Sequence, residues 1–119
     1  MHNRKLYLAR FKRKTDQLTF YKVGQCWQYD ASERFLFDNK QYDEYDIKIM
    51  TSAWGPAGEV EEWEERFLRI KKKDFWLKGK FSGITEIRQF DQSELTYLFA
   101  QFKRLSNLWY ESRQSKVQG

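Results

Sequence analysis

The sequence predicts an α/β domain in which a β-hairpin and further short strands pack against amphipathic helices. Residues 5–11 and 17–24 are rich in strand-forming residues and flank a polar, basic stretch, a pattern typical of a hairpin. Apolar residues then recur at helical spacing in residues 57–72 and again after residue 94. A chain that alternates strand and helix patterns in this way favours a sheet with helices packed on it.

Size and composition favour one soluble domain. With 119 residues, we expect a single domain over residues 1–119, with its core at about 5–109 and a flexible tail at 111–119. An aromatic content of 18% supplies bulky side chains for that core. The one cysteine, Cys26, excludes an internal disulfide, and no apolar run approaches the ~18 residues that cross a bilayer. We therefore expect a cytoplasmic protein.

A short helix is expected after the hairpin. Asp30-Ala31-Ser32-Glu33 has the form of a capping box, with a side chain that caps the helix and a glutamate three residues later. The helix is expected to continue through about Phe37, which places Arg34 in its first turn.

Two further strands are expected. Residues 46–54 alternate Ile47, Ile49 and Thr51 against polar or flexible neighbours, and a Gly-Pro pair ends the pattern. Residues 84–87 follow a turn-rich connection and predict a second, shorter strand.

The helix predicted over residues 57–72 carries an unusual carboxylate. Glu64 is four residues after Val60 and four before Leu68, so it lies on or beside the apolar stripe. Burying an ionised carboxylate is costly unless a cation or hydrogen bonds compensate. Glu64 is therefore the glutamate with the strongest case for a function; the alternative is a structural salt bridge to a lysine or arginine.

The last helix is expected to be part of the core. Residues 91–94 again resemble a capping box, and the apolar stripe that follows includes Leu95, Leu98 and Phe102. We expect this helix to fray beyond Tyr110.

Polar residues with a recognisable order lie on the first two strands and on two of the helices. Tyr7 follows Lys5-Leu6 on the first strand, Tyr21-Lys22-Val23-Gly24 lies on the second, Arg34 on the short helix and Glu64 on the longer one. This set resembles the motifs of the GIY-YIG nuclease family. The resemblance covers about residues 5–90. It implies a small central antiparallel sheet flanked by helices, with a tyrosine on each of the first two strands, an arginine on the next helix and a metal-binding glutamate on a later helix.

The second motif leaves two candidates for its functional side chain. An ungapped match places Lys22 where the family has its second tyrosine, whereas Tyr21 is one residue earlier and on the opposite face of the strand. A phage- and restriction-associated branch of the family reads Tyr-Lys-Ile-Gly at this point, and this chain looks closer to that branch. No residue matches the asparagine that closes some family sites, and Glu86 is a candidate substitute.

The resemblance implies a metal-dependent endonuclease of the kind that phages and mobile elements encode. Glu64 would hold one divalent ion, magnesium or manganese, because a carboxylate supplies the hard oxygen that magnesium prefers. Tyr7 or Tyr21 would activate water, with Lys22 or the metal as the cation that a phenol of pKa about 10 needs nearby. Arg34 would stabilise the charge on the phosphate.

The charge balance favours a nucleic-acid partner. The chain has 22 Lys plus Arg against 17 Asp plus Glu, and double-stranded DNA is the leading candidate for a monomer or homodimer of this kind. The hairpin tip and the run after the longer helix would contact the phosphate backbone through Arg10, Lys12, Arg13, Lys14, Lys71, Lys72 and Lys73. The alternative is that these runs are solvated surface. Trp27 and Tyr29 either stack on a base or pack under their loop.

Two other functions stay open. The first is a weak or inactive nucleic-acid-binding domain of the same fold, which Lys22 in place of a tyrosine permits. The second is an interaction protein that inhibits a host enzyme through an aromatic surface. The structural alternatives for the individual residues are core packing for Tyr7 and Tyr21, and a solvated helix position for Arg34.

Overall fold

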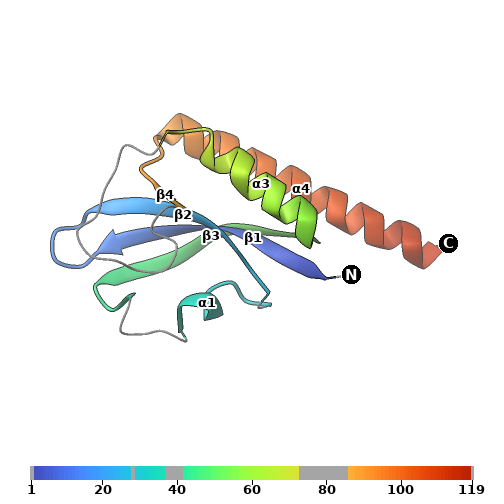
Figure 1. Cartoon of the computed structure of the whole chain (residues 1–119), viewed down its shortest axis with the longest axis horizontal. Helices are drawn as coiled ribbons and strands as arrows, with labels where there is room; N and C mark the ends of the chain where they lie inside the picture. Colours follow the sequence, from blue (N-terminus) through green and yellow to red (C-terminus); the bar gives the residue numbers. More distant parts are fainter. Residues whose placement is uncertain (1, 28, 37–41, 73–85, 119) are drawn as a thin grey trace.

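A four-stranded antiparallel sheet packed against two helices forms the architecture of the computed structural model (Figure 1). The structure describes residues 2–27, 29–36, 42–72 and 86–118. The strands lie in the order β3-β1-β2-β4, and they are β1 (Asn3–Arg13), β2 (Thr19–Cys26), β3 (Tyr45–Pro56) and β4 (Ile87–Arg88). The predicted α/β class with an antiparallel sheet is confirmed.

The predicted hairpin is formed by β1 and β2. Their register runs from Lys5 opposite Cys26 to Lys12 opposite Thr19. The turn closes with a hydrogen bond of 2.8 Å from the Arg13 N–H to the Leu18 carbonyl, and Gln17 adopts a positive φ of 64°. Polar residues tolerate this turn, and the strand-forming residues on both sides then pair along their whole length.

Strand β3 departs from the alternation that its sequence suggests. Its register against β1 shifts between Leu8 and Ala9, because Thr51 pairs with Leu8 whereas Ile49 pairs with Ala9. Met50 is therefore the extra residue of a β-bulge. Thr51 consequently does not share a face with Ile47 and Ile49 as predicted, since a bulge reverses the phase of the side chains that follow it.

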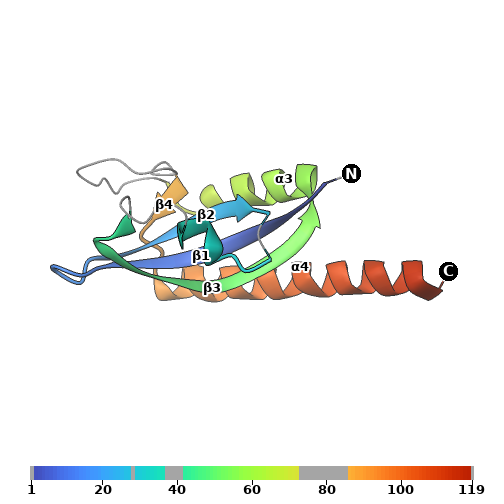
Figure 2. The ribbon, with the colours of Figure 1, turned by 90° about the horizontal axis from the view of Figure 1, so that it is seen from below.

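Each face of the sheet carries its own core. Helices α3 (Ala57–Leu68) and α4 (Gln92–Gln118) cover one face, and the short helix α1 (Glu33–Leu36) lies on the other (Figures 1 and 2). We call the first the helix-side core; its buried residues are Leu6, Leu8, Val23, Ala53, Val60, Phe67, Phe90, Leu95, Leu98, Phe102 and Leu105. We call the other the aromatic core; it contains Tyr7, Ala9, Phe11, Phe20, Cys26, Ala31, Phe35, Tyr42 and Ile87.

The capping box predicted at the start of α4 is confirmed. The Asp91 N–H donates to Glu94 Oε1 and the Glu94 N–H donates to Asp91 Oδ1, both at 2.8 Å. The helix continues to Gln118, so the tail predicted to be flexible is helical through that residue. Arg113 lies 5.0 Å from the Trp109 ring one turn earlier, a contact that supports the last turns. This end of α4 runs past the sheet (Figure 2).

Other boundaries differ by a few residues from those predicted. Helix α3 ends at Leu68 rather than about residue 72, and β3 includes the Gly-Pro pair expected to end it. Phe37 and residues 84 and 85 lie outside the described residues, so those parts of the predictions concern positions that the structure does not describe. No helix in the described part of the chain is both long and apolar enough to span a bilayer.

Candidate active site

Tyr7 and Lys22 meet on the face of the sheet that carries the aromatic core. Tyr7 pairs with Gly24 across the hairpin and Lys22 pairs with Ala9, so both side chains lie on the same face. The Lys22 ammonium donates to the Tyr7 hydroxyl at 2.7 Å. Tyr7 is fully buried and Lys22 is 3% exposed. A buried ammonium is rare in a protein of this size and requires compensation from its surroundings.

Gly24 provides the space in which the two groups meet. A Cβ atom at this position would lie 2.5 Å from the Tyr7 hydroxyl and 2.7 Å from Lys22 Nζ. Any larger residue would therefore displace one of these two side chains. The glycine of the second motif is explained by this close approach rather than by its backbone conformation.

Glu86 supplies the negative charge that Lys22 needs. Its Oε2 lies 3.0 Å from Lys22 Nζ, and its side chain is 30% exposed. Glu86 immediately precedes β4, which pairs with β2 at Tyr21 and Lys22. The short strand β4 therefore positions the Glu86 carboxylate beside the buried Lys22 ammonium.

Glu64 reaches the same cluster from α3. Gln25 Nε2 donates to Glu64 Oε2 at 3.1 Å. The pKa of Glu64 is raised from 4.5 to about 7, first by burial and then by the negative charge of Glu86, while the Gln25 hydrogen bond and the Lys22 charge act in the opposite direction. Two carboxyl groups therefore lie close enough to repel each other beside one ammonium.

The contacts pass from one face of the sheet to the other beside Gly24. Gln25 pairs with Leu6 and so lies on the helix side, whereas Lys22 lies on the opposite face. Glu86 interacts with both Lys22 and Glu64, and thus connects the two sides. We call Tyr7, Lys22, Gln25, Glu64 and Glu86 the polar cluster.

Tyr21 is not part of the polar cluster. It pairs with Arg10 and lies on the helix side, where its ring is 6.3 Å from that of Phe90. The alternation of side chains along β2 separates Tyr21 from Lys22, so a single strand cannot bring both to the same site. Of the two candidates for the second motif, the structure places Lys22 beside Tyr7.

Arg34 lies in α1, and its side chain is not among those that the structure describes. The neighbouring residue, Phe35, packs edge-on against the Tyr7 ring with 5.6 Å between the ring centroids. The helix that carries Arg34 is therefore next to Tyr7.

Part of the basic hairpin tip is engaged within the protein. Arg13 forms a two-pronged contact with Asp16, at 2.9 and 2.5 Å, which lowers the pKa of the Asp16 carboxyl to about 2. Lys14 is exposed, Lys12 is half-buried, and Arg10 Nε is buried without a hydrogen-bond partner among the described residues. Lys14 is thus the member of the tip most open to a phosphate.

The second basic run is also partly engaged. Lys71 donates to the Gln89 carbonyl at 2.6 Å and lies 3.4 Å from Glu94, whereas Lys72 is exposed. Lys73 lies outside the described residues. Lys71 therefore connects the segment after α3 to Gln89 and to the first turn of α4, a structural role that the sequence did not predict.

One residue of the cluster, Gln25, was missed in the sequence. Gln25 directly follows the motif glycine, and its position opposite Leu6 could have indicated that it faces the helix. Trp27 and Tyr29 were given two alternatives, and the structure leaves them 74% and 86% exposed, so neither packs under its loop.

Glu64 and Glu86 are suitable ligands for a divalent cation. Among the described residues, no three His, Cys, Asp or Glu side chains gather as a metal site would require. Magnesium needs fewer protein ligands, because it keeps several of its waters and binds through one or two carboxylates. A divalent cation would also relieve the repulsion that raises the pKa of Glu64. The residues present therefore fit such an ion.

No family model, curated protein or solved structure matches this chain. The geometry of the polar cluster is therefore the basis for a proposed function.

Proposed function

We propose that the protein is a metal-dependent endonuclease that hydrolyses phosphodiester bonds in nucleic acid, with DNA as the first candidate. The observation that carries the proposal is the contact series from the Tyr7 hydroxyl through Lys22 and Glu86 to Glu64. It joins a phenol, an ammonium and two carboxylates from four different elements or their ends. The GIY-YIG resemblance implies a phenol and a metal-binding glutamate in one site, and this arrangement supports that expectation.

Tyr7 is the proposed base. Lys22 donates to its hydroxyl at 2.7 Å, and an adjacent ammonium favours the phenolate form of a tyrosine. A phenolate can accept the proton of a water that attacks phosphorus. Both residues are buried, which strengthens the electrostatic effect of the ammonium, and the attacking water would have to enter from the side of Glu86, whose side chain is 30% exposed.

Glu64 and Glu86 are the proposed holders of a divalent ion, magnesium or manganese. When bound, such an ion would offset the negative charge that develops on the phosphoryl oxygens. Gln25 fixes the orientation of the Glu64 carboxylate from the helix side, at 3.1 Å. Lys22 holds the Glu86 carboxylate at 3.0 Å from the opposite side. These two contacts keep both carboxylates in place before a substrate arrives.

The proposal is tested by incubating the purified protein with supercoiled plasmid and magnesium. Wild-type protein is expected to nick the plasmid, and Glu64→Gln and Tyr7→Phe are each expected to lower the rate by about 100-fold or more, since each removes a group that acts on the reacting atoms. Glu65→Gln is the matched control, because Glu65 is the next residue of α3 and is exposed. Its rate should equal that of the wild type. Nicking that survives in Glu64→Gln would overturn the proposal.

A nucleic-acid-binding domain without catalytic activity is the second candidate. The observation that favours it is the pairing of Lys22 with Glu86, which neutralises one of the two carboxylates that would hold an ion. DNA binding without nicking, in magnesium and in manganese, would support this candidate over the first.

A further inference from the structure

Aromatic and cationic side chains from a loop, two strands and α4 lie next to one another, starting beside the polar cluster. Lys5 is two residues before Tyr7 on β1 and lies on the same face, about 7 Å away along the strand. Its ammonium is 5.3 Å from the centre of the Tyr29 ring and 5.0 Å from that of Trp54, and it donates to the Tyr29 carbonyl. Among the described residues no carboxylate forms an ion pair with Lys5. The two rings and the Tyr29 carbonyl are therefore its direct contacts, and it also has a charge interaction with Asp30, whose pKa is lowered first by its hydrogen bonds to Ser32 and in part by Lys5.

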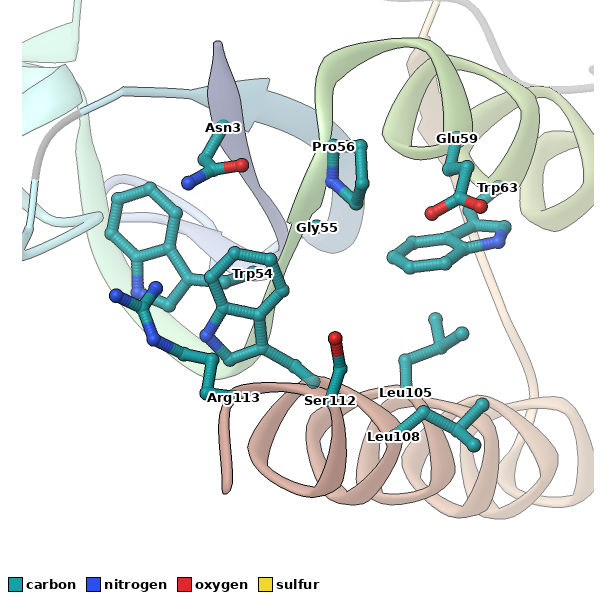
Figure 3. A pocket seen from close by; sticks show the side chains of 11 residues that line it. Asn3, Trp54, Gly55, Pro56, Glu59, Trp63, Leu105, Leu108, Ser112 and Arg113 are labelled. Carbon is teal, nitrogen blue, oxygen red and sulfur yellow. The ribbon is translucent and has the colours of Figure 1, made fainter. Parts of the chain in front are cut away.

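The series continues on α4. The Arg113 guanidinium lies 5.0 Å from the Trp109 ring, and both residues line a cavity of about 710 Å³ together with Trp54. Figure 3 shows Arg113 reaching toward Trp54 from α4, with the cavity open between these residues and Trp63 on α3. We call Tyr29, Lys5, Trp54, Arg113 and Trp109 the aromatic ladder.

The fold does not use these rings to fill either core. Tyr29, Trp54 and Trp109 belong to neither buried cluster, and Tyr29 is 86% exposed. Tyr29 is exposed and Trp54 and Trp109 are half-buried, and rings that stay accessible beside cations favour a binding function. Accessible rings with the exposed Arg113 guanidinium beside them suit a ligand that offers flat faces and negative charge in turn.

We propose that the aromatic ladder binds an unpaired strand of nucleic acid, so that the substrate carries a single-stranded segment beside the phosphate at Tyr7. The bases would stack on the rings, and the backbone would follow the side of the ladder that carries the exposed Arg113, whereas the buried Lys5 holds Tyr29 and Trp54 in place. An unpaired strand is required because bases in a duplex stack on each other and offer no free face. The position of the cut rests on the proposed nuclease function, whereas binding to the ladder does not.

The opposite wall of the cavity determines on which side of the rings the phosphates of the bound strand would lie. Glu59 lies above the Trp63 ring on that wall, as Figure 3 shows, and its negative charge would repel phosphates. The phosphates are thereby confined to the side of Arg113.

The experiment measures binding without cleavage. The Glu64→Gln protein is mixed, in the absence of metal, with a fluorescein-labelled oligothymidylate of about 12 nucleotides, a length typical of single-strand sites. Fluorescence anisotropy then gives the dissociation constant for this protein and for versions that also carry Trp54→Leu or Trp109→Ala. Each loss of a ring should weaken binding about tenfold or more. Tyr110→Ala is the matched control, because Tyr110 is the next residue of α4, is 66% exposed and does not line the cavity. It should change the constant less than twofold.

A blunt duplex of the same length separates the ladder from general attraction to phosphate. Its affinity should be the same with and without the ladder substitutions, and thermal unfolding of each variant confirms that it is folded. Equal loss of affinity for both ligands, or no loss for the oligothymidylate in a folded variant, would overturn the proposal. If the ladder substitutions weaken oligothymidylate binding but the wild-type protein cleaves nothing, only the proposed nuclease function is refuted. If the wild-type protein cleaves but the ladder substitutions leave oligothymidylate binding unchanged, only the proposed single-strand site is refuted.

Discussion

The two faces of the sheet bury their residues for different reasons. The helix-side core consists of apolar side chains from the sheet and from α3 and α4. The opposite face buries Tyr7 and Lys22 among aromatic rings, and Lys22 is 3% exposed. Packing alone explains the first face, because burial of apolar area is favourable by itself. It does not explain a buried ammonium, and this difference is the reason we propose the polar cluster as the functional site.

The largest effect on stability is expected on the helix side. Leu98 is fully buried in α4, so Leu98→Ala should lower the free energy of unfolding by about 2–5 kcal/mol. At a temperature where the variant stays folded, its plasmid-nicking rate should stay close to that of the wild type. Tyr7→Phe should show the reverse pattern: a loss of about 1–3 kcal/mol in the free energy of unfolding, because Lys22 loses one partner but keeps Glu86, and a nicking rate lower by about 100-fold or more. Chemical denaturation and the nicking assay together measure both quantities, and a parallel loss of both in each variant would remove the distinction between the faces.

A smaller effect is expected where the faces meet at Gly24. Gly24→Ala places a methyl group 2.5 Å from the Tyr7 hydroxyl, which should cost about 1–3 kcal/mol and break the contact between Tyr7 and Lys22. Gly58→Ala is the matched control, since a Cβ at Gly58 meets nothing within 4 Å. Because Gly58 lies inside α3, that substitution should stabilise the protein by about 0.5–1 kcal/mol. Equal stability of the two variants in a urea titration would contradict the packing around Gly24.

The sequence predicted the elements whose signals are local. The hairpin, the capping box at Asp91 and the half-buried position of Glu64 follow from alternation, turn chemistry and helical spacing, and the structure contains all three. The bulge at Met50 could not be predicted from the sequence, because apolar residues occupy both faces of β3 near it and the alternation pattern shows no break. The length of α4 was underestimated because its last turns carry few apolar residues.

The polar cluster was predicted in part. Tyr7, Lys22 and Glu64 were candidates from the motifs, but the choice between Tyr21 and Lys22 needed the register of β2, which residue identity alone does not give. Glu86 could be suggested only as a substitute, since the strand that positions it has two residues. The aromatic ladder depends on the pairing of Lys5 with Trp54, a contact between residues far apart in the chain.

The smallest effect is a dependence of stability on pH. In the folded protein the pKa of Glu64 is raised to about 7, against 4.5 for the unperturbed group. Between these values the unfolded chain has released its proton while the folded protein still holds it, so stability falls as pH rises through this window. Glu64→Gln removes the penalty, and should stabilise the protein on the order of 1 kcal/mol at about pH 8, after allowance for the solvent that reaches this half-buried group.

The control for this effect is the same comparison at about pH 5, where the two proteins should differ little because Glu64 is protonated in the folded state. Thermal unfolding across the pH range measures the difference. A stabilisation that is largest at low pH would mean that the pKa of Glu64 is lowered rather than raised.

The proposed nuclease function depends most on the convergence of Glu64, Glu86 and Tyr7 around one ion-binding site. A crystal of the protein soaked in manganese tests this directly, because anomalous scattering locates the ion without ambiguity. We expect an ion held by the Glu64 and Glu86 carboxylates, close to the Tyr7 hydroxyl. Manganese bound elsewhere, with these two carboxylates free of it, would overturn the proposed function.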